Sequence, residues 1–190
     1  IDFYGGIDFR YYKGTHTNEI IDLYDGAYFM DSSRGKVSAA NNKNASNDAW
    51  RNEKLSVGDV VYRDYDGHVM QEGVFFQGEY NRENISAFLS GSLSNSTYWR
   101  YDRFYYDEQH AKSEKLNHIG FNLKAGANYN INENHNVFAN VGYISRAPKF
   151  SHAFMQENVS NVVNKHTKNE KALLVDLGYG FRNERLQMNV

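Results

Sequence analysis

The densest group of side chains suited to binding a ligand runs from Trp99 to Glu108, where aromatic and charged residues alternate. Aromatic rings stack on sugars and flat ligands, while guanidinium and carboxylate groups bind hydroxyls and carboxylates. We predict a ligand-binding loop here, with contacts from Trp99, Arg100, Tyr101, Arg103, Tyr105 and Tyr106. The alternative is that the same residues form only an interfacial aromatic belt and a solvated loop.

Other residue patterns predict no catalytic or metal site. The chain has no cysteine, which excludes disulfides, thiolate metal sites and catalytic thiols. Its seven histidines are scattered without a helical i, i+4 pair. The segment Asp64–Gly67 is similar to the start of a calcium loop but lacks the glutamate that should follow. Neither a Gly-x-Ser-x-Gly elbow nor a P-loop is present, so we expect no enzyme activity, metal or cofactor.

Charge and hydropathy narrow the class of protein further. The net charge of −2 gives no electrostatic reason to expect nucleic acid as a partner. Mean hydropathy is −0.73, and no run of apolar residues is long enough for a membrane helix. A membrane β-strand needs only ~9–11 residues that alternate apolar and polar, so a membrane β-protein remains open. Because Ile1–Tyr4 has no signal-peptide character, we expect the chain to begin inside a longer protein.

Alternation with a period of two residues dominates the chain and predicts β-strands whose apolar side chains share one face. Polar residues such as Asp8, Arg10, Lys124 and Asp176 take the other face. We predict an all-β fold, an antiparallel up-and-down meander of about seven strands. The predicted strands are Phe3–Tyr11, Val74–Tyr80, Asn84–Leu93, Ile119–Tyr129, Val137–Tyr143, Leu173–Phe181 and Leu186–Val190.

The connections between these strands alternate between short and long. The short turns are Asn81–Asn84, Asn130–Asn136 and Arg182–Arg185, and the long loops are Lys13–Gly73, Tyr98–Lys115 and Ser145–Ala172. This alternation is typical of outer-membrane barrels, and Tyr80 and Tyr129, beside short turns, suit an interfacial aromatic girdle. Within the first long loop we expect a small hairpin that turns at Asp66-Gly67.

Two segments near the end of the chain carry a family resemblance. The strand Asn136–Ser145 ends in Arg146-Ala147-Pro148, and Asn169-Glu170-Lys171 precedes a strand that contains Leu177-Gly178-Tyr179. This pattern resembles the C-terminal half of the barrel of TonB-dependent outer-membrane receptors. The family's Asn-Pro-x-Leu element is not present, and Asn164–Thr167 stands in its place. His152 and His166 lie where haem-importing members carry a ligand, but the haem pattern is incomplete.

The resemblance implies that residues 1–190 are part of a barrel domain, 22-stranded in the family, whose plug domain is absent from this chain. It also implies a location in the cell outer membrane of a Gram-negative bacterium. The expected function is binding and TonB-coupled import of a siderophore, vitamin or glycan. The expected partners are the TonB complex through the plug, the nutrient and outer-membrane lipid. Within the motif we expect structural tasks for Arg146, Ala147, Pro148 and Glu170, with Arg146 bonding loop carbonyls or a carboxylate such as that of Glu170.

Three other interpretations remain open at this point. A passive outer-membrane barrel or adhesin would have the same strand pattern without a plug. A soluble secreted β-sandwich would bind glycans through tyrosine- and tryptophan-rich loops. An outer-membrane esterase or protease would need a reactive serine, for which the sequence defines no geometry.

Overall fold

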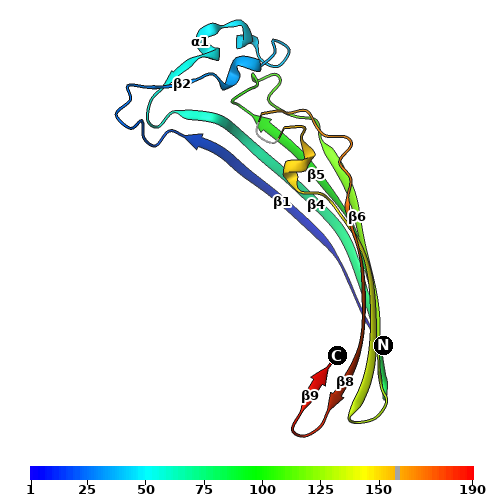
Figure 1. Ribbon diagram of the computed structural model, residues 1–190. Helices are drawn as coiled ribbons and strands as arrows, with labels where there is room; N and C mark the ends of the chain where they lie inside the picture. Colours follow the sequence, from blue (N-terminus) through cyan, green and yellow to red (C-terminus); the bar gives the residue numbers. More distant parts are fainter. Residues whose placement is uncertain (157–158) are drawn as a thin grey trace.

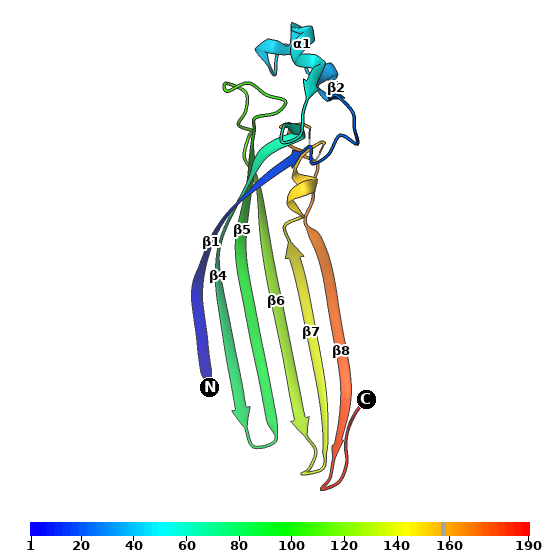
Figure 2. The same ribbon diagram turned by 90° about the vertical axis from the view of Figure 1, so that its left-hand side faces the viewer.

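The computed structural model describes residues 1–156 and 159–190. Its main element within these residues is a seven-stranded antiparallel sheet, the main sheet, in which each strand pairs with the next large strand along the chain (Figures 1 and 2). The predicted all-β meander is therefore confirmed. The strands in spatial order are β1 (Asp2–Glu19), β4 (Val60–Arg82), β5 (Ile85–Asp102), β6 (Leu116–Asn130), β7 (His135–Arg146), β8 (Glu170–Arg182) and β9 (Gln187–Asn189).

The smaller elements lie in the long connections, at the end of the sheet opposite the short turns (Figure 2). Between β1 and β4, strands β2 (Phe29–Asp31) and β3 (Glu53–Leu55) pair with each other. Three single-turn helices lie in the same connection: η1 (Ser33–Lys36), η2 (Lys43–Ser46) and α1 (Asp48–Arg51). The Asp31 carboxylate accepts from the Ser33 backbone N–H at η1, and the Asn42 and Asn47 side chains cap η2 and α1. A fourth short turn, η3 (Phe150–Ala153), lies between β7 and β8. No helix in the described residues is long and apolar enough to cross a membrane.

The register of the main sheet puts the predicted apolar faces side by side. Ile7 pairs with Val74, Val74 with Leu93, and Leu93 with Phe121, so one row of apolar side chains crosses four strands. We call this exposed surface the apolar band. Its members are Phe3, Ile7, Phe9, Val74, Phe76, Leu89, Leu93, Ile119, Phe121, Leu123, Val137, Val141, Leu173, Val175 and Leu177.

The opposite side of the main sheet, the polar face, carries the polar members of each alternating strand. Asp176 pairs with Asn140, and Lys124 pairs with Gly142, both on this face. Asp8 and Arg10 also lie on it, since they alternate with Ile7 and Phe9 of the apolar band. The predicted division of side chains between two faces is therefore confirmed.

Asparagine forms the short turns in the way its chemistry favours, because its side chain can bond nearby backbone groups. The Asn132 side chain accepts hydrogen bonds from the backbone N–H groups of Asn134 and His135. Asn183 does the same for Arg185 and Leu186. These bonds close the β6–β7 and β8–β9 turns and keep the strands in register.

The predicted hairpin at Asp66-Gly67 is wrong, because β4 runs straight through these residues. Asp66 pairs with Thr15 on β1 and Tyr101 on β5, so it lies inside the sheet. Glycine is needed here for close approach rather than for a turn. A Cβ on Gly67 would come within 3.0 Å of the Phe150 ring, which lies against the strand.

All three long loops are shorter than predicted, because the strands continue past their apolar segments. The connections span residues 20–59, 103–115 and 147–169. Beyond the apolar band, the strands carry mostly polar and aromatic side chains. Backbone pairing continues there although the alternation of apolar residues has ended.

The buried core lies at the long-loop end of the molecule, where loops pack on the polar face and on each other. One cluster joins Tyr98 of β5 to Ala153, Phe154 and Val163 of the 147–169 loop. A second is formed within the 103–115 loop by Phe104, Tyr105, Tyr106 and Ala111. The remaining length of the sheet is a single layer with both faces exposed.

Candidate functional site

The predicted ligand residues are divided by the alternation of β5, which reaches Asp102. Trp99 and Tyr101 lie on the same side as the apolar band, since they pair with His68 and Asp66 of β4. Arg100 lies on the polar face and is fully buried beneath the loops. Trp99 and Arg100 therefore point to opposite sides of the sheet and cannot contact one small ligand together.

Arg100 is held by a dense set of partners. Its Nε donates to the Asn161 side-chain oxygen at 3.0 Å, and its guanidinium lies 3.5 Å from the Asp102 carboxylate. The guanidinium carbon also lies 4.7 Å from the centre of the Tyr65 ring and 4.9 Å from that of Phe154. Paired and stacked in this way, Arg100 organises the loop core.

Tyr105 and Tyr106 are also buried, each with a partner for its hydroxyl group. The Tyr105 hydroxyl donates to the Tyr62 carbonyl at 2.7 Å, and burial raises the pKa of Tyr105 above its ordinary value. The Tyr106 hydroxyl accepts a hydrogen bond from the Asn161 backbone N–H. Both rings belong to the loop core, so their contact with a ligand would require the loops to open.

Arg103 is the most accessible charged member of the predicted set. It binds Asp64 at 2.6 Å and Asp66 at 2.9 Å, and 36% of its side chain is exposed. Hydrogen bonds from Arg103 to Asp64 and then Asp66 raise its guanidinium pKa further, which keeps it charged at any physiological pH. Its charge is offset by these two carboxylates, so Arg103 links the end of β5 to β4.

The three long loops are joined to one another by polar side chains. Asn161 donates to the Ala111 carbonyl at 2.7 Å, which ties the 147–169 loop to the 103–115 loop. Asp107 accepts from the Lys43 backbone N–H at 2.9 Å, and Arg34 donates to the Phe104 carbonyl at 3.2 Å. The loops consequently form one connected body at this end of the sheet.

The residues of the Arg146-Ala147-Pro148 segment and Glu170 have structural contacts. Arg146 and Glu170 end paired strands, and the guanidinium binds the carboxylate at 2.6 Å, which is one of the two kinds of contact expected for Arg146. The Tyr98 hydroxyl donates to the Pro148 carbonyl, and Ala147 packs on the cluster around Tyr98. The motif thus anchors the start of the 147–169 loop to the polar face.

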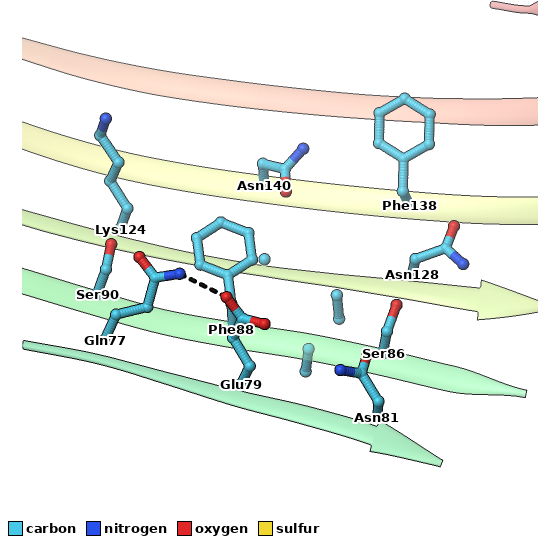
Figure 3. Close-up of a pocket in the computed structure, with 13 residues that line it drawn as sticks. Gln77, Glu79, Asn81, Ser86, Phe88, Ser90, Lys124, Asn128, Phe138 and Asn140 are labelled. Carbon is cyan, nitrogen blue, oxygen red and sulfur yellow. Dashed lines mark hydrogen bonds between the residues drawn. The ribbon is translucent and has the colours of Figure 1, made fainter. Parts of the chain in front are cut away.

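A shallow basin of about 650 Å³ lies on the polar face towards the short turns (Figure 3). The side chains come from β4, β5, β6 and β7, and hydroxyl and amide groups predominate among the polar ones. One internal hydrogen bond joins the Gln77 amide to the Glu79 carboxylate at 2.6 Å. The labelled residues of this polar basin are Gln77, Glu79, Asn81, Ser86, Phe88, Ser90, Lys124, Asn128, Phe138 and Asn140.

Two phenylalanines in the polar basin lie against glycines of the neighbouring strand. The Phe88 ring occupies the space where a Cβ on Gly126 would be, and Phe138 does the same at Gly178. These close contacts hold the rings flat along the sheet and leave the polar groups accessible. The alternation of β4 to β7 placed these residues on one face, but their gathering into a basin depends on the register between strands.

No group of three or more His, Asp or Glu side chains is arranged to hold a metal ion in the part of the chain that the structure describes. Comparisons of the chain with protein-family models, with curated proteins and with solved structures find no match.

Proposed function

We propose that this chain forms part of the barrel wall of a TonB-dependent receptor that imports a scarce nutrient across the outer membrane. The observation that carries the membrane part of the proposal is the apolar band, on which no other layer of the described residues packs. The TonB-coupled import part depends on the sequence resemblance around Arg146-Ala147-Pro148. Isolated exposed apolar residues are ordinary, but an apolar surface that extends over six strands marks contact with a membrane or a partner, even though Glu72 and Asn95 interrupt it in the row of Phe9 and Ile119. Ile7 is 87% exposed, and Leu177 is 73% exposed.

The height of the apolar band suits the hydrocarbon layer of an outer membrane. At ~3.4 Å per residue, the stretch Ile85–Leu93 is about 27 Å long. A strand tilt of about 40° reduces this to about 21 Å, and aromatic rings at both ends extend it towards the ~25 Å of known barrels. Tyr80, Tyr129 and Tyr179 lie on this face beside the short turns, as an interfacial girdle requires.

The edges of the main sheet support a larger closed structure. Strand β1 pairs only with β4 among the described residues, and β9 covers only the last few residues of β8. Unpaired strand edges cannot be exposed in hydrocarbon, because each free backbone group costs several kcal/mol there. Further strands of the same barrel would satisfy both edges.

The polar face and the loops support a receptor rather than a simple membrane anchor. Charged and amide-bearing side chains are tolerated where a barrel encloses a wet interior. At the long-loop end, η3 and Phe154 pack onto this polar face, so in a closed barrel they would narrow its interior. A nutrient captured by the loops would then meet the polar basin or a plug domain seated there.

The alternative interpretations predict different surroundings for the apolar face of the main sheet. A β-sandwich buries the apolar face of one sheet under a second sheet. Among the described residues, the other sheet is the small β2–β3 pair, which lies in the 20–59 loop and leaves the apolar band exposed. The band therefore favours a barrel wall. A passive barrel or adhesin shares this wall, and energy dependence separates it from the importer.

The membrane part of the proposal is tested by fractionating bacterial cells that express the full-length protein. We expect the protein in the outer-membrane fraction. Extraction with carbonate should leave it in the membrane, and extraction with detergent should release it. Recovery in a carbonate-soluble fraction would contradict the barrel wall.

The transport part is tested by growth of a strain that lacks the protein. The strain is grown on a limiting ferric siderophore, cobalamin or oligosaccharide as nutrient. We expect the strain to grow poorly on one of these nutrients. Expression of the protein should restore growth only when TonB is active. Correction without TonB would indicate a passive barrel instead.

A further inference from the structure

A group of basic and aromatic side chains lies directly beyond the apolar band, on the same outer side of the sheet. In one row near the loops, Lys13 of β1 pairs with His68 of β4, which pairs with Trp99 of β5. In the next row towards the loops, Tyr101 pairs with Lys112 in an isolated bridge. These side chains therefore lie on the outer surface, at the boundary between the apolar band and the loops.

The aromatic members are stacked into a rigid layer. The rings of His68 and Trp99 are nearly parallel with centres 4.9 Å apart, and Tyr11 stacks on both at 6.1 Å. The Tyr11 hydroxyl is 2.8 Å from His68 Nδ1. On the β6 side, the Lys115 ammonium lies 4.9 Å from the centre of the Trp99 ring. This arrangement fixes where the positive charges stand relative to the membrane boundary.

We call Lys13, Arg103, Lys112 and Lys115 the cationic patch. Two carboxylates partly balance it: Asp66 binds both Lys13 and Arg103, and Asp64 binds Arg103. In residues 1–156 and 159–190, Lys112 and Lys115 have no ion pair with a carboxylate, and both are exposed. Two ammonium groups are thus available to an anion at this level.

We propose that the cationic patch binds the phosphate of a phosphorylated lipid headgroup in the membrane leaflet next to the long loops. The inference rests on the proposed function, because it requires the apolar band to lie in hydrocarbon. Given that placement, Trp99 and Tyr11 stand at headgroup level, where amphipathic rings are favoured. Lys112 and Lys115 then meet the lipid phosphates, and the acyl chains of the same lipid run along the apolar band. Basic side chains at a membrane surface recognise anionic headgroups in this way.

The test uses Trp99 as the reporter, so every other tryptophan of the full-length protein is replaced by phenylalanine; within residues 1–190 this is Trp50. The resulting single-tryptophan protein is purified in a neutral detergent and titrated with dioctanoyl phosphatidic acid or dioctanoyl phosphatidylcholine. We expect the Trp99 emission to respond to phosphatidic acid at a concentration about tenfold lower, or less, than the concentration of phosphatidylcholine that gives the same response. Inorganic phosphate is titrated separately to distinguish a lipid headgroup from a free anion.

Charge variants identify the residues that select the lipid. K112E/K115E should abolish the preference for phosphatidic acid, and K112Q/K115Q should reduce it. The matched control, K36E/K43E, makes the same change in net charge at two exposed lysines of the 20–59 loop and should keep the full preference. The neutral variant still tests the two lysines if the charge-reversed variant misfolds. Circular dichroism checks that each variant retains its β-sheet.

The possible results separate this proposal from the proposed function. Equal responses to both lipids, in a protein that is folded only with detergent, would overturn the lipid site and leave the barrel wall intact. An equal and saturating response to inorganic phosphate would overturn the lipid headgroup as the ligand. A protein that folds without detergent would overturn the barrel wall, and the lipid site with it.

Discussion

The two faces of β6 show how much a single residue depends on the side of the sheet it occupies. Leu123 belongs to the apolar band and is 50% exposed, while Lys124, its neighbour in sequence, lines the polar basin. A charged side chain should therefore be tolerated at the position of Lys124 and should impair assembly at the position of Leu123. In the proposed barrel, the difference arises because one face contacts hydrocarbon and the other a wet interior.

We predict that Leu123→Arg impairs assembly of the protein into the outer membrane. An arginine near the middle of the hydrocarbon layer costs about 2–4 kcal/mol. The assembled fraction can be measured by detergent extraction and by resistance to protease. Asn128→Arg, on the polar face of the same strand, is the control and should assemble normally. Normal assembly of L123R would contradict the assignment of the apolar band to lipid.

A second prediction concerns Asn161, whose side chain bonds Arg100 and the carbonyls of His110 and Ala111. Asn161→Ala removes these bonds inside the loop core and should lower its local stability by about 2–3 kcal/mol. Hydrogen exchange of the Asp102 amide, which donates to Ala111, measures this opening. Asn164→Ala is the control, since the bonds of Asn164 are exposed, and its effect should stay below about 1 kcal/mol. Equal effects of the two substitutions would show that Asn161 does not hold the loops together.

At the level of elements, the long loops depend on one another through a few polar contacts. Asp107 joins the 103–115 loop to the start of η2 by accepting from the Lys43 backbone N–H. That hydrogen bond, followed by the one with His110, holds the pKa of the Asp107 carboxyl below its ordinary value. The contact is therefore sensitive to acid.

We predict that acid loosens this contact between loops. Because the folded-state pKa is lowered, the stabilisation is fully present above the unfolded pKa of about 3.9 and is lost as the pH falls through the folded value. Hydrogen exchange of the Lys43 amide, corrected for the intrinsic rate, should therefore lose protection below about pH 4. Asp107→Asn keeps an acceptor without the titrating group and should remove this dependence. The same loss of protection in D107N would assign the effect to another group.

For the whole molecule, the main consequence of the fold is that many large apolar side chains stay exposed to solvent. The main sheet exposes an apolar band on one side, and two of its edges are open within the described residues. Within the same residues, the two buried clusters lie at the long-loop end. Such a molecule gains little by folding in water, since most of its apolar side chains stay exposed.

We predict that a polypeptide of residues 1–190 precipitates in detergent-free buffer and is dispersed by mild detergent. Exposed apolar surface and open strand edges both favour association of copies in water. Sedimentation and light scattering with and without detergent measure the outcome. A monomeric, β-rich and detergent-free polypeptide would contradict the barrel wall and support the soluble interpretation.

The sequence by itself determined the strands, their order and the division of side chains between faces. A period of two residues is a local property, and sheet pairing between neighbours in the chain follows from it. Arg146 and Glu170 were also a candidate pair in advance, because they stand near the two ends of one predicted loop and a guanidinium can bind a carboxylate. Asn132 and Asn183 marked turns for an equally local reason.

Only the tertiary structure decided the ends of the strands and the contents of the loop core. The Asp66-Gly67 pair carries a turn signal, yet pairing with strands on both sides and the approach of Phe150 keep it extended. Arg100 reads as a surface ligand residue, yet it is buried because Asn161 and Phe154, far along the chain, pack against it. Burial of this kind depends on contacts between distant segments, which local alternation does not encode.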